Sequence, residues 1–275
     1  MAKRKEDPQQ TDLGQDLRGF DMASTIDWYT QNSEALLTRL PQAVITEPYF
    51  AIGEGQGYVS LTTGEIAALV NLFPANALKR SRLKLGTIVG GPTRYFKKGS
   101  TAENPLDTEN IEEAIGATYI IPSFTKNVSE DWSSTVALYQ IPDYVSPSVR
   151  KLIHAQGLIH EVAHTLLTPL YRRADFLRLP DGIVVNGREY ILEFAHAVSA
   201  HSPFSHYSSA GKDKDPNLSN KRAIEEEFAE AVTGYLLGFV HTQEQRRQLD
   251  PFVDRPEVRQ LIGAFLNAEV VINPS

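Results

Sequence analysis

The chain of 275 residues contains no cysteine. Disulfide bonds and thiolate metal ligands are therefore excluded, and histidine, aspartate and glutamate are left as the side chains that bind a metal ion strongly. A chain without cysteine is also typical of a reducing compartment. Histidine is scarce too, with seven residues in the whole sequence, so two histidines at a defined spacing are informative.

The sequence also lacks long apolar runs. No stretch approaches the roughly 20 apolar residues that a membrane-spanning helix needs. Residues 1–8 are followed by polar residues instead of the apolar segment of a signal peptide. We therefore expect a cytoplasmic protein without a membrane partner. Export by a route that needs no cleavable signal is the alternative.

The chain has no excess of positive charge: its formal net charge is −7 and its isoelectric point is near 5.5. Neither nucleic acid nor an anionic membrane is an expected partner of such a chain. One stretch, residues 79–98, is locally basic, but its aromatic residues are limited to Tyr95 and Phe96. A solvated strand-and-loop face explains this stretch better than a nucleic-acid surface, which would carry more interleaved aromatics. We assign it no function.

The composition, with 41% hydrophobic and 22% charged residues, is that of an ordinary globular protein. We expect a disordered tail at residues 1–22, an N-terminal α/β layer at residues 23–116 and a catalytic domain at residues 117–275. The expected fold class is α+β, with a mixed sheet, a metal-binding helix and a helical C-terminal half.

Patterns of apolar residues predict the following elements. Helices are expected at residues 25–40, 66–73, 190–200 and from 219 or 220 to 239. Strands are expected at residues 43–52, 58–61, 117–121 and 134–141. Thr62 and Glu65 have the spacing of a capping box, and Asn186-Gly187 is typical of the turn of a small hairpin.

A metal-binding motif lies at residues 158–164, which read Leu-Ile-His-Glu-Val-Ala-His. The nearly all-round apolar pattern predicts a buried helix that begins at residues 146–148 and stops before Pro169. His160 and His164 then lie one turn apart on the same face, where both can bind one metal ion. Glu161 is placed to act as a general base on a metal-activated water. The alternative is a core helix whose histidines hydrogen-bond to backbone carbonyls. It is disfavoured because two histidines and a glutamate would then be buried on one face, which costs free energy.

The strand expected at residues 134–141 leads directly into this helix. Such a strand could form a sheet edge that pairs with an extended peptide, although its ordinary role would be that of a sheet strand with no ligand. His154 lies near the Glu161 side of the same helix, two turns earlier, whereas His196 and His241 are isolated. We interpret all three as core or surface residues.

A catalytic zinc site needs a third protein ligand. The histidine that a metzincin would place at position 170 is a leucine here, so the next candidates lie in the helix that starts near residue 220. In that helix Glu227 borders the apolar stripe, whereas Glu226 and Glu230 project from the opposite face, where a solvated carboxylate is the ordinary interpretation. The residues alone leave Glu226, Glu227 and a histidine such as His201 or His206 as alternatives.

The motif His160-Glu161-Val162-Ala163-His164, followed by Glu226-Glu227-Phe228-Ala229-Glu230, resembles the gluzincin class of zinc metallopeptidases. The second block is more similar to the anthrax lethal factor type than to thermolysin. The resemblance covers residues 117–240. It implies a zincin-like fold, Zn²⁺ as cofactor and Glu226 as the third ligand. It further implies that Glu230 orients a ligating histidine and that Tyr207 stabilises the oxyanion.

The expected function is hydrolysis of peptide bonds in a protein or peptide substrate, within a narrow substrate range. Zinc would be held by His160, His164 and Glu226, with Glu161 as general base. A zinc hydrolase of a non-peptide bond on the same scaffold is one alternative, and a non-catalytic binding protein is another.

Overall fold

The computed structural model of the chain describes residues 22–43, 51–52, 56–81, 87–91, 116–122, 132–141, 143–173, 176–201, 204, 221–240 and 250–271. Residues 1–21 of the expected tail lie outside this range, and Met22 begins the first helix. The described part is mostly helical and contains two small sheets, which agrees with an α+β fold. No helix in the described ranges is long and apolar enough to cross a membrane.

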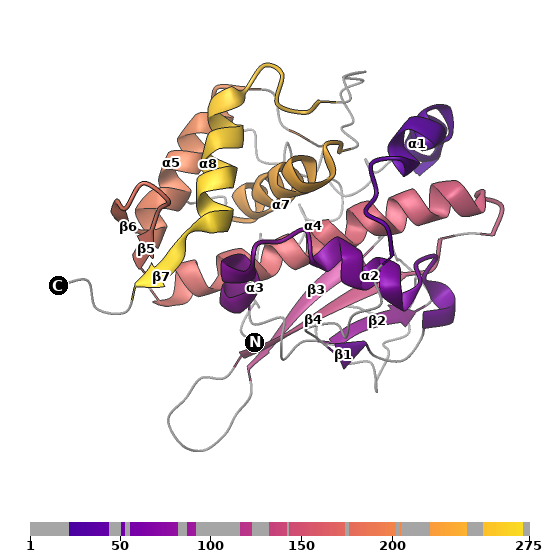
Figure 1. Cartoon of the computed structure of the whole chain (residues 1–275), viewed down its shortest axis with the longest axis horizontal. Helices are drawn as coiled ribbons and strands as arrows, with labels where there is room; N and C mark the ends of the chain where they lie inside the picture. The colour runs from indigo at the N-terminus through magenta and orange to yellow at the C-terminus, as the bar shows by residue number, and fades with distance from the viewer. Residues whose placement is uncertain are drawn as a thin grey trace, which may run out of the picture.

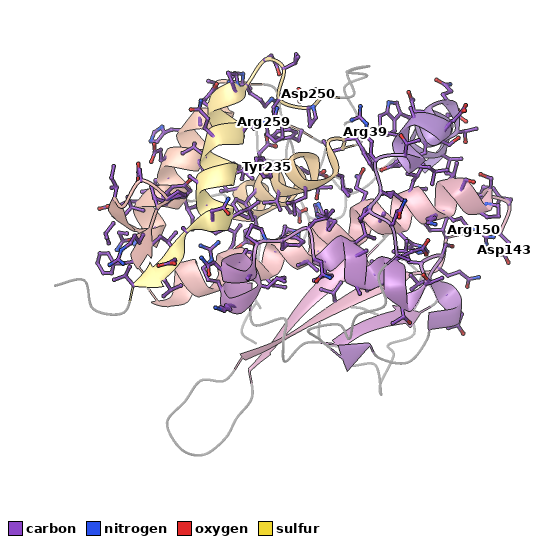
Figure 2. All side chains as sticks on the ribbon, in the orientation of Figure 1. Arg39, Asp143, Arg150, Tyr235, Asp250 and Arg259 are labelled. Atoms are coloured by element: carbon purple, nitrogen blue, oxygen red, sulfur yellow. The ribbon has the colours of Figure 1, made fainter. Side chains whose placement is uncertain are left out.

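Helix α4, Pro147–Arg173, runs through the middle of the molecule (Figure 1). Its start agrees with the prediction: Pro147 is the first helical residue, and the Val149 N–H donates to the Ser146 hydroxyl at 3.4 Å. Asp143 and Arg150 form an ion pair beside this end (Figure 2).

The expected stop before Pro169 is wrong, because α4 continues to Arg173. A proline inside a helix costs about 3 kcal/mol, since it removes one backbone hydrogen bond. Leu166 and Leu167, in the turn before Pro169, are each 1% exposed, and their burial helps to offset this cost.

A four-stranded mixed sheet lies on one side of α4 (Figure 1). Its order is β1 (Ala51–Ile52), β2 (Thr87–Gly91), β4 (Trp132–Tyr139), β3 (Gly116–Pro122). The first three strands are parallel, and β3 runs antiparallel to β4. The mixed sheet is therefore confirmed. Of the two alternatives for the strand before α4, the sheet edge is not observed, because β4 pairs on both sides, with Ile88 opposite Val136 and Ala117 opposite Ala137.

Three helices of the N-terminal part pack against α4. They are α1 (Met22–Leu37), α2 (Thr63–Val70) and α3 (Ala75–Ser81). The capping box is confirmed: the Glu65 N–H donates to the Thr62 hydroxyl and the Thr62 N–H donates to the Glu65 carboxylate. The strand expected at residues 58–61 is wrong, because Gln56–Tyr58 forms a 3-10 turn that leads to the Thr62 cap. Residues 44–50 of the other expected strand lie outside the described ranges.

The C-terminal half contains α5 (Gly187–Ser199), α7 (Lys221–Leu237) and α8 (Pro256–Asn267). A three-stranded antiparallel sheet joins β6 (Val184–Asn186), β5 (Phe176–Arg178) and β7 (Glu269–Val271). The expected hairpin is present between β5 and β6, but its turn is at Asp181-Gly182, where Gly182 has a φ of 88°. Asn186 instead caps α5, because its side chain accepts from the Arg188 N–H at 2.9 Å.

Buried residues of α1, α2, β4, α4, α5, α7 and α8 form one hydrophobic cluster. The cluster places α7 directly against α4, with α1 along another part of the same helix (Figure 1). The domain division at residue 117 stays a prediction.

Candidate metal centre

Three side chains from two helices meet where α7 packs on α4. The His160 Nε2 lies 3.1 Å from the His164 Nε2 and 3.2 Å from the Glu226 Oε2, and the third separation, His164 Nε2 to Glu226 Oε2, is 3.6 Å. One ligand atom of each residue lies within 4.8 Å of the other two. Among the described residues no other group of three histidines or carboxylates meets this condition.

The separations fit one metal ion. Zinc bonds of 2.0–2.2 Å in a tetrahedron put neighbouring ligand atoms roughly 3.3–3.6 Å apart, close to the three observed values. Two imidazole nitrogens and one carboxylate oxygen are also a ligand set that zinc accepts. Between 16% and 20% of each of the three side chains is exposed, so solvent reaches the group. A closed structural site would shield its ligands more completely.

Helix α7 is buried on nearly all sides, and its Glu226 side chain faces α4. Helical spacing suggested that the side opposite Ile224 and Phe228 is solvated, and this interpretation is wrong. Ala229 and Val232 are fully buried, and the side that carries Glu226 and Glu230 packs on the histidine-bearing helix.

Glu227 is not part of the metal group. Its carboxylate is 1% exposed and accepts from the Phe204 N–H, at 3.0 Å from Oε2 and 3.3 Å from Oε1. Its Oε1 also lies 3.8 Å from the Arg255 guanidinium, which stacks on the Phe204 ring at 4.1 Å. The structure therefore gives Glu227 partners other than a metal ion.

The histidine alternatives are resolved in part. His201, at the end of α5, hydrogen-bonds Glu257 of α8 and does not join the metal group. His206 and the proposed oxyanion residue Tyr207 lie outside the described residues. Of the other histidines, His154 is fully buried and accepts from the Ser60 N–H at 2.9 Å, and His196 is exposed. Both agree with the expectation of core or surface residues.

Two further carboxylates surround the triad. The Glu230 Oε1 lies 3.8 Å from the His160 Nδ1, on the side of the ring away from Glu226, and the side chain is 8% exposed. Glu161, next to His160 in α4, is also buried. Both carboxylates therefore lie close enough to His160 for their charges to act on its ring.

The charges of the site favour a cation. Burial alone would lower the pKa of His160, but the hydrogen bond to Glu226 and the charges of Glu230, Glu226 and Glu161 raise it to about 10. Burial opposes ionisation of Glu226, yet His160 and His164 hold the pKa of its carboxyl well below the ordinary value. The negative electrostatic potential of these glutamates favours a proton on His160, and it favours a bound metal ion for the same reason.

Sequence analysis missed a hydrogen bond that joins α1 to α4. The Tyr29 hydroxyl of α1 donates to the Gln156 side chain of α4, one turn before His160. Tyr29 is 1% exposed. No motif relates residues 127 positions apart, and a tyrosine in an amphipathic helix is usually a packing residue.

Comparison with known protein families, with characterised proteins and with solved structures gave no match for this chain. The geometry alone therefore supports a His/His/Glu group that could hold a metal ion, consistent with an HExxH-plus-Glu site.

Proposed function

We propose that this chain is a zinc metallopeptidase of the gluzincin class with a zincin-like fold. The observation that carries the proposal is the position of Glu226, whose Oε2 lies 3.2 Å and 3.6 Å from the Nε2 atoms of the two motif histidines. Such a triad beside an HExxH glutamate is the arrangement expected of a catalytic zinc site. His160, His164 and Glu226 would hold the ion.

Zinc bound there would supply a Lewis acid and a water of lowered pKa. Glu161 accepts a proton from the attacking water and passes it to the leaving amine, because its carboxylate is adjacent to His160 and is buried. Glu230 holds the His160 ring in orientation through Nδ1. Tyr207, outside the described residues, is proposed to donate a hydrogen bond to the oxyanion.

The sheet supports a peptide substrate. Strand β3 pairs with β4 on one side and has no second partner among the described strands, and it packs near α4. An extended peptide can hydrogen-bond to the backbone of such an edge, which would present its scissile bond to the neighbouring helix. This role falls to β3 and not to β4, the strand that the sequence suggested.

A narrow substrate range fits a protein proposed to act in the cytoplasm, since an unrestrained protease there would damage its host. The substrate itself is defined by loop contacts and is best found by experiment.

The test compares cells that express the wild-type protein with cells that express Glu161→Gln. Proteome-wide sequencing of protein N-termini should find new termini in a small set of proteins, in wild-type cells only. Identical termini in both cultures, from wild-type protein that carries zinc, would contradict peptidase activity. That result would favour a zinc hydrolase of another bond or a binding protein.

A further inference from the structure

A buried polar cluster lies next to the proposed metal ligand Glu226, and it consists of Phe204, Glu227 and Arg255. The Glu227 carboxylate accepts from the Phe204 N–H, at 3.0 Å from Oε2 and 3.3 Å from Oε1. The Arg255 guanidinium lies 3.8 Å from the Glu227 Oε1 and 4.1 Å from the centre of the Phe204 ring. Each of the three residues is 1% exposed. The residue directly after Glu226 is therefore held by a backbone N–H and a cation from two other parts of the chain.

This polar cluster restrains the rotation of α7 more sharply than the apolar contacts of the helix do. Helix α7 packs against both α4 and α8 (Figure 1). Apolar burial has no directional preference, whereas a hydrogen bond to a carboxylate depends on distance and angle. A buried carboxylate that moves away from its donor also loses the compensation for its own burial. Glu227 therefore favours one rotation of α7 about its axis.

Glu226 needs this restraint because a metal ligand tolerates little displacement. Its Oε2 lies 3.2 Å and 3.6 Å from the Nε2 atoms of His160 and His164, which belong to α4. An atom at the surface of a helix is roughly 5–6 Å from the axis, so a rotation of about 10° moves it by roughly 1 Å. Metal–ligand distances are held to about 0.2 Å. Such a rotation of α7 would therefore take Glu226 out of bonding distance of an ion held by the two histidines.

The other end of α7 is held by a contact that restrains rotation less. Arg39, just after α1, donates to the carbonyl of Gly238, the residue after the end of α7. A backbone carbonyl lies close to the backbone radius of roughly 2.3 Å, so its lever arm about the helix axis is short. The Glu227 carboxylate lies at the helix surface and has a lever arm roughly twice as long. It is also the residue next to Glu226, whereas Gly238 is twelve positions further along the chain.

We propose that Glu227 is a positioning residue of the metal centre, whose contacts with Phe204 and Arg255 fix the rotation of α7 that brings the Glu226 carboxylate to the ion. This inference rests on the proposed metal site but not on peptidase activity. Glu227 does not join the group of three possible ligands. Its effect on the metal passes through the residue before it.

The experiment measures the zinc dissociation constants of full-length variants by competition with a chromogenic chelator. Glu227→Ala should weaken binding by about ten- to a hundredfold, the usual range for residues that support a metal ligand. Glu227→Gln keeps an acceptor for the Phe204 N–H but loses the charge towards Arg255, and should weaken binding by about two- to tenfold. The visible absorption of the cobalt-substituted protein should change in both variants, because the carboxylate of Glu226 is displaced.

A second set of variants tests whether the effect passes through Glu226. In Glu226→Ala the two motif histidines remain, and Cu²⁺, which binds imidazole more tightly than zinc does, measures their affinity. In this background Glu227→Ala should change the Cu²⁺ dissociation constant by less than about twofold, because the ligand that it positions is already absent. A larger additional loss would overturn the inference, since Glu227 would then act on the histidines or on the whole fold.

Ile262→Ala is the matched control for loss of stability. Ile262 of α8 is 1% exposed, and α8 packs on α7. The variant therefore loses buried contacts and should lower the thermal midpoint. Its zinc affinity and cobalt spectrum should stay those of the wild-type protein, because the polar cluster is intact. An equal loss of affinity in Ile262→Ala and Glu227→Ala would overturn the inference, since destabilisation alone would then explain the effect.

Wild-type affinity and an unchanged cobalt spectrum in Glu227→Ala would overturn the inference and leave the metal site intact. If circular dichroism shows that Glu227→Ala does not fold, the same result in Glu227→Gln would overturn it. Absence of zinc binding by the wild-type protein would overturn both the inference and the proposed function. A wild-type protein that binds zinc but cleaves nothing would contradict the proposed function alone.

Discussion

The Glu227 carboxylate and the Arg255 guanidinium lie 3.8 Å apart, and both side chains are 1% exposed. The pair joins α7 to the residue before α8, and Glu227 also accepts from the Phe204 N–H. Successive side chains leave a helix in directions about 100° apart. When the Glu227 side chain is held by Arg255 and Phe204, the rotation of α7 about its axis is therefore fixed, and Glu226 points towards α4. A buried ion pair thus joins α8 to the helix that carries Glu226.

The first prediction follows from this pair. Glu227→Ala should lower the free energy of unfolding by about 1–3 kcal/mol, because it removes the acceptor of the buried Phe204 N–H and one of the two carboxylates beside Arg255, the other being Asp254 at 3.4 Å. Urea unfolding of the metal-free protein measures the change. Glu34→Ala, which removes an exposed carboxylate of α1, is the control and should have little effect. Wild-type stability in Glu227→Ala would show that the pair does not hold α7.

The second prediction separates the glutamates of α7. Glu226→Ala should remove most of the zinc, because two histidines alone hold the ion poorly against water. Glu230→Ala should keep the site and weaken affinity by roughly ten- to a hundredfold. Zinc content after dialysis, together with chelator competition, gives both values. If Glu226→Ala binds zinc as tightly as the wild-type protein, the third ligand is another residue.

The third prediction concerns Glu161. Glu161→Gln should retain zinc and the fold but lose turnover, because the amide cannot accept a proton and the residue is not a ligand. The measurements are zinc content, circular dichroism and cleavage of a substrate identified by the proteomic comparison. Loss of zinc in this variant would mean that Glu161 binds the metal.

The fourth prediction is a pH dependence of stability at the contact between α2 and α4. Burial opposes ionisation of Glu65, but Lys151 of α4 and the Thr62 cap outweigh it and lower the pKa of this carboxyl. The stabilisation is therefore present above a pH of about 4.5, the ordinary pKa of this carboxyl, and is lost as the pH falls through the lowered pKa.

Chemical denaturation between pH 3 and pH 7 measures this effect. Glu65→Gln should be less stable than the wild-type protein at pH 7, and the difference should shrink towards pH 3. Glu189→Gln, in the first turn of α5, is an exposed control. A difference that stays constant across the range would contradict a contribution from the Glu65 charge.

The metal-binding helix could be predicted from the sequence because its evidence is local. His160 and His164 need only helical spacing to share a face, and Ser146-Pro147 marks the start of the helix. The stop at Pro169 was wrong because a proline is a local signal, whereas the burial that offsets it comes from the packing of several other elements.

The third ligand could not be derived from helical spacing alone. Helical spacing identifies the apolar stripe of α7, but it does not show that α4 packs on the other side of the helix. Spacing alone therefore predicts a solvated Glu226, whereas Glu226 faces α4 in the structure. The contact that sets the rotation joins Glu227 to Phe204 and Arg255, and no pattern relates these positions in the sequence. The resemblance implied Glu226, and Glu226 is the residue that lies beside the histidines.

The most direct test of the metal centre is the zinc content of the purified protein after reconstitution and dialysis, measured by elemental analysis. The wild-type protein and His196→Ala, a control at an exposed histidine of α5, should each retain about one zinc ion per chain. The double variant His160→Ala/His164→Ala should retain none. Full zinc occupancy in the double variant, or none in the wild-type protein, would contradict a metal site at the meeting of α4 and α7.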